Sequence, residues 1–340
     1  MSVTETYKQE NSIFPKVEKN QILERISKAD NITITGHRNP DCDCICSGLA
    51  LSLLIKNIFN KDCTVVNTDK IQRDLKNILF VDRVIFEVNE NNLPKKDVLI
   101  ILDSGDIERI GWIADITDKY NEVIFIDHHK VRNIKGVTMF YDDIKAGATC
   151  EIIVDIFQDY LEKFDSTIAT LLYSGICTDT GSFIFSNTTE RTLLYGSKLM
   201  SIGIIQENLG NIVRKRYTKN DVAALMEIYR RMVIDYDNKI GYICLEDTIC
   251  GTSIKELGVS ASDTLIQMED VLIGFIIHEG DDNFRVSIRS RCSKDIREVA
   301  ESFGGGGHPK ASGFSVLKKD YTKEKLIEEI NNKLVNLLCS

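Results

Sequence analysis

Four short segments of the 340-residue chain hold most of the side chains that could carry out chemistry. Carboxylates and imidazoles dominate them, and such donors favour harder divalent cations, Mn²⁺ or Mg²⁺ before Zn²⁺. So many carboxylates would repel one another unless cations neutralised them. Two ions that share one carboxylate are a common device for displacement at phosphorus. The segments are His37-Arg-Asn-Pro-Asp41-Cys-Asp43, Asp103-Ser-Gly-Asp106, Asp127-His128-His129 and Cys177-Thr-Asp179.

The elements before these segments predict that they meet in space. Buried strands are expected at residues 31–37, 62–67, 97–102 and 122–126, separated by helical patterns such as 43–60. Continuous β-branched runs of this kind are typical of a parallel sheet with helices on both faces. The carboxyl ends of parallel strands lie at one edge, where ligands bind. A single aspartate after a strand is often only a turn former or helix cap. The whole set, with three of the five histidines, favours one shared site.

The second half of the chain predicts a smaller α/β domain. Strands are expected at 240–245, 271–278 and 284–289, with helices at 221–236, 295–303 and 323–338. Residues 284–310 hold six basic and three acidic side chains, a local excess of three positive charges in a chain of net charge −9. The glycine run 304–307 could present backbone N–H groups to an anion. This segment therefore favours phosphate recognition.

Together, these motifs resemble the DHH phosphoesterase family. The segments above match its metal-binding domain, while Ser287-Ile-Arg289-Ser290 and Phe303-Gly-Gly-Gly-Gly-His308 resemble the DHH-associated substrate-binding domain. Their order and spacing are most similar to the branch of bacterial oligoribonucleases (nano-RNases) that are also 3′-phosphoadenosine 5′-phosphate phosphatases. The resemblance implies an α/β fold with a catalytic domain at 15–200, a helical linker at 201–218 and a substrate-binding domain at 219–340.

The resemblance also implies a role for each position. His37 and Asp41 would hold a first metal ion, Asp43 and His128 a second, and Asp103 would bridge both. Asp179 would complete the second ion's coordination, and Asp127 would orient the neighbouring imidazoles. The implied catalytic residues are His129, Asp103 and Asp127. His129 would face the scissile phosphate. The implied substrate-binding residues are Arg109, Ser287, Arg289, Gly305, Gly306 and His308.

The expected activity is hydrolysis of very short oligoribonucleotides and of phosphorylated adenosine nucleotides. A hydroxide held by two metal ions would attack the phosphorus, and Mn²⁺ is the expected cation. Hydrolysis of linear or cyclic dinucleotide messengers is an alternative, and a nucleotide-binding regulatory module is the non-enzyme alternative. The complete set of candidate ligands disfavours a module that has lost catalysis. The oligomeric state stays open, with a homodimer as one option.

The composition and the net charge restrict the binding surface and the cellular location that we expect for this protein. The acidic net charge argues against a broad nucleic-acid-binding surface. The N-terminus lacks a signal-peptide pattern, and no uninterrupted apolar run approaches the ~18–20 residues of a membrane span. Ten cysteines are then best explained as reduced thiols, so we expect a cytoplasmic protein without a membrane segment.

A run of alternating cysteines, Cys42, Cys44 and Cys46, replaces the small residues common in the family. It raises the alternative of a soft-metal or redox site. The other seven cysteines show no C-x-x-C spacing, and free cysteine usually behaves as a small buried hydrophobe. We therefore expect the run not to ligate the catalytic ions.

Overall fold

The computed structural model describes residues 16–89, 93, 97–130, 133–213, 217–254 and 261–339. The chain divides into two compact units, residues 1–216 and 217–340, which are treated separately below. Unit 1 contains a five-stranded sheet of order β2-β1-β3-β4-β5 in which every neighbouring pair is parallel. Its strands are β1 (Ile32–Gly36), β2 (Cys63–Val65), β3 (Val98–Leu102), β4 (Glu122–Asp127) and β5 (Met139–Asp142).

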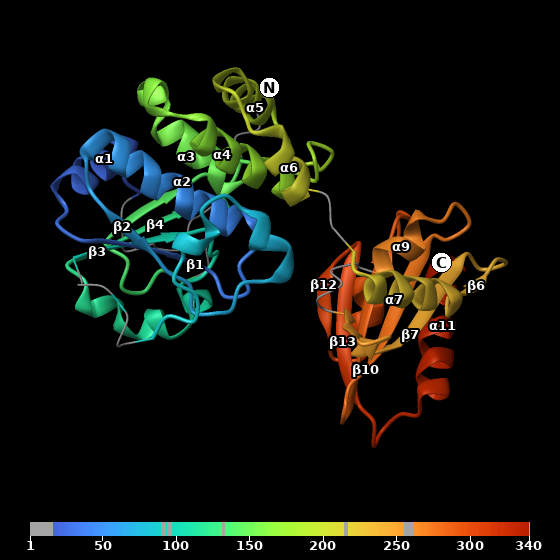
Figure 1. Cartoon of the computed structure of the whole chain (residues 1–340). Coiled ribbons are helices and arrows are strands. Elements are labelled where there is room, and N and C mark those ends of the chain that lie inside the picture. Colours follow the sequence, from blue (N-terminus) through green and yellow to red (C-terminus); the bar gives the residue numbers. More distant parts are fainter. Residues whose placement is uncertain are drawn as a thin grey trace, which may run out of the picture. The chain divides into compact units, whose positions relative to one another are not determined.

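Both faces of this sheet are covered, because successive apolar side chains of β3 and β4 point to opposite faces. On β3, Ile100 and Leu102 belong to the core under the α-helices, while Leu99 and Ile101 face the opposite core. Figure 1 shows the α-helices of the first core on one side of the sheet. They are α1 (Lys19–Lys28), α2 (Cys42–Phe59), α3 (Thr149–Ile156) and α4 (Ser166–Asp179). The 3-10 helix η3 (Ile107–Lys119) covers the other face, interrupted at Gly111.

Unit 1 also contains shorter and later elements. The helical stretch 149–163 is divided into α3 and the 3-10 helix η4 (Gln158–Lys163). Two short 3-10 helices, η1 (Arg73–Asn77) and η2 (Val81–Arg83), follow β2. Helix α5 (Glu190–Ile202) precedes α6 (Gln206–Val213), which lies within the predicted linker; residues 214–216 are outside the described residues.

Unit 2 is built on a six-stranded mixed sheet of order β12-β13-β11-β10-β7-β6. Only β7 and β10 pair in parallel. The strands are β6 (Val233–Asp235), β7 (Ile240–Glu246), β10 (Ile273–Glu279), β11 (Asn283–Ser290), β12 (Gly306–His308) and β13 (Ala311–Leu317). A separate pair is formed by β8 (Thr248–Ile249) and β9 (Thr252–Ser253). The helices are α7 (Lys219–Arg230), α9 (Ala261–Gln267), α10 (Arg297–Glu301) and α11 (Lys323–Cys339).

The predicted helix 221–236 was too long. Helix α7 ends at Arg230, and residues 233–235 form strand β6 instead. A turn in which Asn238 donates to Asp235 joins β6 to β7, with which β6 pairs. The backbone of residues 233–235 is therefore satisfied by a partner strand, which overrides the local helical pattern.

Helix α2 is long and apolar enough to cross a membrane by length and composition, although polar residues interrupt its apolar runs. It begins directly after Asp41 and carries Asp43 and Lys56, and 67% of it is buried within the protein. A buried core helix passes the same test, and α2 packs in the core of unit 1.

Close packing of α4 on this core generates a stability prediction. A Cβ on Gly175 would lie 2.3 Å from Cys150 Sγ and 2.7 Å from Asp43 Oδ1. We expect Gly175→Ala to lower the free energy of unfolding by about 1–3 kcal/mol, the usual cost of overpacking. In the control Gly210→Ala on α6, no atom lies within 4 Å of the new Cβ, so helix propensity should raise stability by up to about 1 kcal/mol. Equal urea-unfolding free energies for the two variants would contradict the packing.

Candidate functional site

The four chemical segments meet at the carboxyl edge of the unit 1 sheet. His37 directly follows β1, Asp103 directly follows β3, and Asp127 is the last residue of β4. In the strand order 2-1-3-4-5, chain direction across the sheet reverses between β1 and β3, where open α/β sheets bind their ligands. The predicted convergence of these segments is confirmed.

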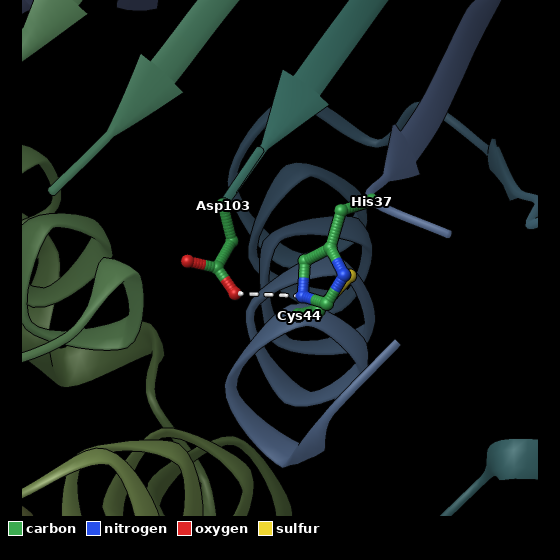
Figure 2. Close-up of side chains that lie close together, drawn as sticks. All are labelled: His37, Cys44 and Asp103. Atoms are coloured by element: carbon green, nitrogen blue, oxygen red, sulfur yellow. Dashed lines mark ion pairs between the residues drawn. The ribbon is translucent and has the colours of Figure 1, made fainter. Parts of the chain in front are cut away.

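One half of the site is formed around His37. Its Nε2 lies 3.5 Å from Asp41 Oδ2 and 3.7 Å from Asp103 Oδ2. Its Nδ1 lies 2.8 Å from the Arg38 carbonyl oxygen, so a proton on Nδ1 leaves the Nε2 lone pair facing the carboxylates. Figure 2 shows His37 and Asp103 facing each other, with Cys44 beside them. The Sγ of Cys44 and ligand atoms of the other two residues lie within 4.8 Å of one another.

The other half is formed around His128. Its Nε2 lies 3.4 Å from Asp103 Oδ1 and 3.3 Å from Asp179 Oδ2. Asp43, His128 and Asp179 form a second group whose ligand atoms lie within 4.8 Å of one another. Asp103 thus contributes one carboxylate oxygen to each half.

Burial makes this collection of charges strongly interdependent. Burial alone would lower the pKa of His128, but the carboxylates of Asp103, Asp43 and Asp179 raise it to about 10. His37 behaves alike: Asp103 and Asp41 outweigh burial and raise its pKa to about 10. Burial disfavours ionised Asp103, yet the two imidazoles hold its pKa well below the usual range. Burial raises the pKa of Asp179 to about 6.

These residues fit divalent cations. The Nε2 atom of His128 is buried without a hydrogen-bond partner and is aimed at two carboxylates. Buried polar atoms almost always have a hydrogen-bond partner. An unpaired imidazole nitrogen that faces two carboxylates is therefore the arrangement expected of a metal ligand. Cations would also relieve the repulsion that, with burial, raises the pKa of Asp43.

The backbone at Asp103 is held in an unusual conformation. Asp103 has φ of 54°, in the left-handed region that few residues other than glycine adopt. The next two backbone N–H groups, of Ser104 and Gly105, donate to Asp127 Oδ2. Strain of this kind is maintained where surrounding contacts over-determine the backbone. Asp127 therefore fixes the position of the shared carboxylate.

Asp127 also orients His129, as its implied role requires. Its Oδ1 accepts from the His129 backbone N–H and lies 2.9 Å from His129 Nδ1. The other imidazole has a different partner, because His128 Nδ1 lies 3.3 Å from the Ala146 carbonyl oxygen. The His129 side chain is 43% exposed, so its ring is available to a ligand.

Arg109, for which the family resemblance implies a place near the substrate phosphate, lies close to His129. A Cβ on Gly105 would lie 3.5 Å from both Arg109 Nη1 and His129 Cβ. Arg109 also donates to the Ser104 carbonyl oxygen at 3.0 Å. An exposed guanidinium and an exposed imidazole therefore flank the same turn beside the acidic cluster.

Sequence analysis missed Thr149, which contacts two of the candidate ligands. Its backbone N–H donates to Asp43 Oδ2 at 2.6 Å, and its hydroxyl donates to Asp103 Oδ1 at 3.1 Å. The next N–H, of Cys150, donates to Asp43 Oδ1 at 3.0 Å. The start of α3 therefore holds Asp43, and Thr149 joins both halves of the site. Thr149 is the first residue of α3, but no sequence signal linked it to residues 46 and 106 positions earlier.

In unit 2, strand register brings the predicted substrate-binding residues onto one sheet face. Arg289 pairs with Ala311, which pairs with His308. Ser287 pairs with Gly313, which pairs with Gly306. Directly paired residues share a face, so the small Ala311 lies between the polar side chains of Arg289 and His308. The opposite face of β11 carries the core residues Phe284, Val286 and Ile288.

The glycine run has a structural role beside its predicted role as an anion nest, because it ends helix α10. The N–H of Gly304 donates to Glu301 and that of Gly305 to Ala300, where α10 ends. A Cβ on Gly305 would lie 2.2 Å from the Gly313 carbonyl oxygen, so β12 approaches β13 as only glycine allows. A Cβ on Gly306 would meet no atom within 4 Å, so a ligand could approach the backbone at this position.

The contacts of Thr149 predict an effect on metal binding. Thr149→Val removes the hydroxyl donor to Asp103 and keeps the backbone N–H to Asp43, whereas Thr149→Ser keeps both. We expect Thr149→Val to weaken Mn²⁺ binding about 10–100-fold, the usual effect of losing a group that orients metal ligands. Thr149→Ser should bind within a few-fold of wild type. Titration calorimetry measures both, and equal affinities of the two variants would contradict this role.

The raised pKa values of His37 and His128 predict the pH dependence of the metal-free protein. Both exceed the ordinary value of 6.5, at about 10, so the folded state binds protons more tightly than the unfolded state. Their stabilisation is therefore complete below about pH 6.5 and is lost as pH rises toward 10. Urea unfolding in chelator should show a falling free energy over this range, with a shallower fall for His128→Gln. Parallel profiles would contradict the prediction.

Comparison with known proteins agrees with this architecture. Residues 31–176 match the DHH family, N-terminal domain, and residues 249–336 match the DHHA1 domain. The Bacteroides fragilis exopolyphosphatase-related protein has the same fold, with TM-score 0.80 and 21% identity over 96% of this chain and 98% of that one.

Curated relatives cover nearly the whole chain. The bifunctional oligoribonuclease and PAP phosphatase NrnA of Mycoplasma pneumoniae is 28% identical, over 93% of this chain and 97% of the relative. The corresponding Streptococcus mutans relative is 30% identical, over 93% and 98%. The cyclic-di-AMP phosphodiesterase PdeA of Listeria monocytogenes is 26% identical, over 93% of this chain and 48% of the relative. The chain thus belongs to the DHH family, whose members are metal-dependent hydrolases of phosphoester bonds.

Proposed function

We propose that this enzyme hydrolyses very short oligoribonucleotides, and 3′-phosphoadenosine 5′-phosphate to AMP, with two divalent cations of which Mn²⁺ is the foremost. The observation that carries the proposal is the shared Asp103 carboxylate, which faces His37 with one oxygen and His128 with the other. The activities named for the NrnA relatives support the choice of substrates. All ten cysteines are free thiols, which suits the cytoplasmic location we include in this proposal.

Each half of the cluster would hold one cation. His37 and Asp41 would bind the first, Asp43, His128 and Asp179 the second, and Asp103 both. When bound, the cations supply Lewis acidity toward a phosphoryl oxygen and activate water for attack. Asp127 and Thr149 keep the shared carboxylate in place through the contacts described above.

His129 and Arg109 would act on the substrate itself. Asp127 holds His129 through Nδ1, which leaves Nε2 to donate a proton to the leaving oxygen. Arg109 would bind the substrate phosphate through its guanidinium, whose planar N–H groups match phosphate oxygens. Both side chains are exposed near the buried carboxylate of Asp103, which supports their contact with a ligand.

Unit 2 would select the substrate. Arg289 and His308 would contact the phosphate or base of a nucleotide across the small residue Ala311, and Ser287 would add a hydroxyl from the same face. The open side of Gly306 and the close approach at Gly305 would let a ligand lie near the backbone of β12. A long RNA strand needs an extended basic groove, so the net charge of −9 favours a substrate of only a few nucleotides.

Cyclic dinucleotide hydrolysis is the second candidate function. The Listeria relative is named as a cyclic-di-AMP phosphodiesterase, and the match covers almost all of this chain. The same metal cluster would serve either substrate, so unit 2 would decide between them. A homodimer stays a prediction from the sequence.

The proposal is tested with a diadenylate, 3′-phosphoadenosine 5′-phosphate, cyclic di-AMP and a small chromogenic phosphodiester, each with Mn²⁺. We expect the first two to be hydrolysed most efficiently, and Asp103→Ala to hydrolyse none. Preferential hydrolysis of cyclic di-AMP would favour the second candidate. Substantial turnover by folded Asp103→Ala would overturn the shared-carboxylate mechanism.

Substitutions in unit 2 should separate substrate selection from chemistry. We expect Arg289→Ala and His308→Ala to lower kcat/KM for the diadenylate about 10–100-fold, since a charge-assisted hydrogen bond contributes about 1.5–3 kcal/mol. Activity on the chromogenic diester, which needs no nucleotide contact, should change little. The control is Arg285→Ala on β11, whose exposed guanidinium pairs with Asp247. Equal losses on both substrates, with a lower Tm, would assign these residues a structural role instead.

A further inference from the structure

The three alternating cysteines of α2 do not share one environment. Cys42 and Cys46 lie one helical turn apart, with their Sγ atoms 3.7 Å from each other, and both belong to the hydrophobic core of unit 1. Cys44 is only 5% exposed, yet it belongs to none of the hydrophobic clusters of the described residues. Two residues along a helix point to different sides, so burial of Cys44 needs another explanation.

Cys44 is surrounded by the polar end of β1 and by the candidate metal cluster. A Cβ on Gly36 would lie 2.3 Å from its Sγ, so the absence of a side chain there makes room for the sulfur. Figure 2 shows the sulfur next to the His37 imidazole, on the helix that faces Asp103. The three ligand atoms lie within 4.8 Å of one another, and all three residues are buried.

These three donors differ in kind from those of the second half of the site. Sulfur, imidazole nitrogen and carboxylate oxygen together suit Zn²⁺, Co²⁺ or Fe²⁺, whereas Mn²⁺ prefers oxygen ligands. In the described residues, the group of Asp43, His128 and Asp179 offers only oxygen and nitrogen. The orphaned Nε2 of His128, aimed at the other oxygen of Asp103, independently points to an ion at this carboxylate.

We propose that Cys44 is a ligand of the first cation position, with His37 and Asp103, and that this position takes a thiophilic divalent ion while the second accepts Mn²⁺. The inference rests on the proposed two-cation site and specifies which kind of cation each position binds. It also revises the sequence expectation for Cys44 alone, since Cys42 and Cys46 stay in the core. On binding, the sulfur exchanges its proton, which passes to solvent, for a bond to the cation.

The test uses the full-length, metal-free protein titrated with Co²⁺, because a thiolate bound to Co²⁺ gives a near-ultraviolet charge-transfer absorption that nitrogen and oxygen ligands do not. We expect this band in the wild type at one thiolate-bound ion per chain. Cys44→Ser should lose the band, and its Zn²⁺ affinity should fall about tenfold or more. In competition dialysis the wild type should retain one Zn²⁺ against excess Mn²⁺, and Cys44→Ser should not.

Matched variants identify the sulfur. Cys42→Ala and Cys46→Ala, on the same helix, and Cys150→Ala, whose thiol lies beside Asp43, should all keep the band. Absence of the band in the wild type at saturating Co²⁺ would overturn the inference without any variant, and so would an unchanged band in Cys44→Ser. Diadenylate hydrolysis measured in parallel separates the two proposals, because a wild type with the band but no hydrolysis would refute only the proposed function.

Discussion

The carboxylate of Asp103 is almost fully removed from water and lies 3.1 to 3.7 Å from one hydroxyl and three imidazoles. A buried negative charge is very unfavourable unless positive or hydrogen-bonding groups surround it. Its surroundings come from the ends of β1 and β4 and the start of α3, so those elements must be in place before the charge can be buried. The left-handed backbone of Asp103 shows that its neighbours impose this position on it.

The same constraint accounts for the chemistry of the cluster. Asp43 and Asp179, together with Asp103, bring several like charges to one sheet edge, and burial strengthens their repulsion. Without cations, protons on His37 and His128 balance these charges, which explains the raised pKa of both. Cations replace those protons when they bind, so metal binding and protonation compete for the same groups. In the proposed site, the soft Cys44 sulfur makes the first half prefer a thiophilic cation, whereas the second half, with oxygen and nitrogen donors, accepts Mn²⁺.

The candidate binding residues of unit 2 lie on a sheet face, in contrast to the buried charges of unit 1. On this candidate binding face, the small residues Ala311 and Gly313 of β13 lie between Arg289 and Ser287 of β11 and the residues of β12. Residues 284–310 carry a local excess of positive charge, which would suit recognition of a phosphate-bearing group. The two units thereby divide the proposed reaction into bond cleavage and substrate selection.

The sequence by itself determined the α/β class, the parallel strands of unit 1 and the segments that carry the chemistry. Those features are local: continuous β-branched runs form buried strands, and polar residues directly after parallel strands share one edge. Only the tertiary structure decided which side chains meet across long separations. Thr149 reaches Asp43 and Asp103 because α3 packs at the sheet edge. Cys44 differs from Cys42 and Cys46 because one side of α2 faces the core and another faces β1. Likewise, residues 233–235 and 306–308 became strands because β7 and β13 offered them backbone partners, which no local pattern could specify.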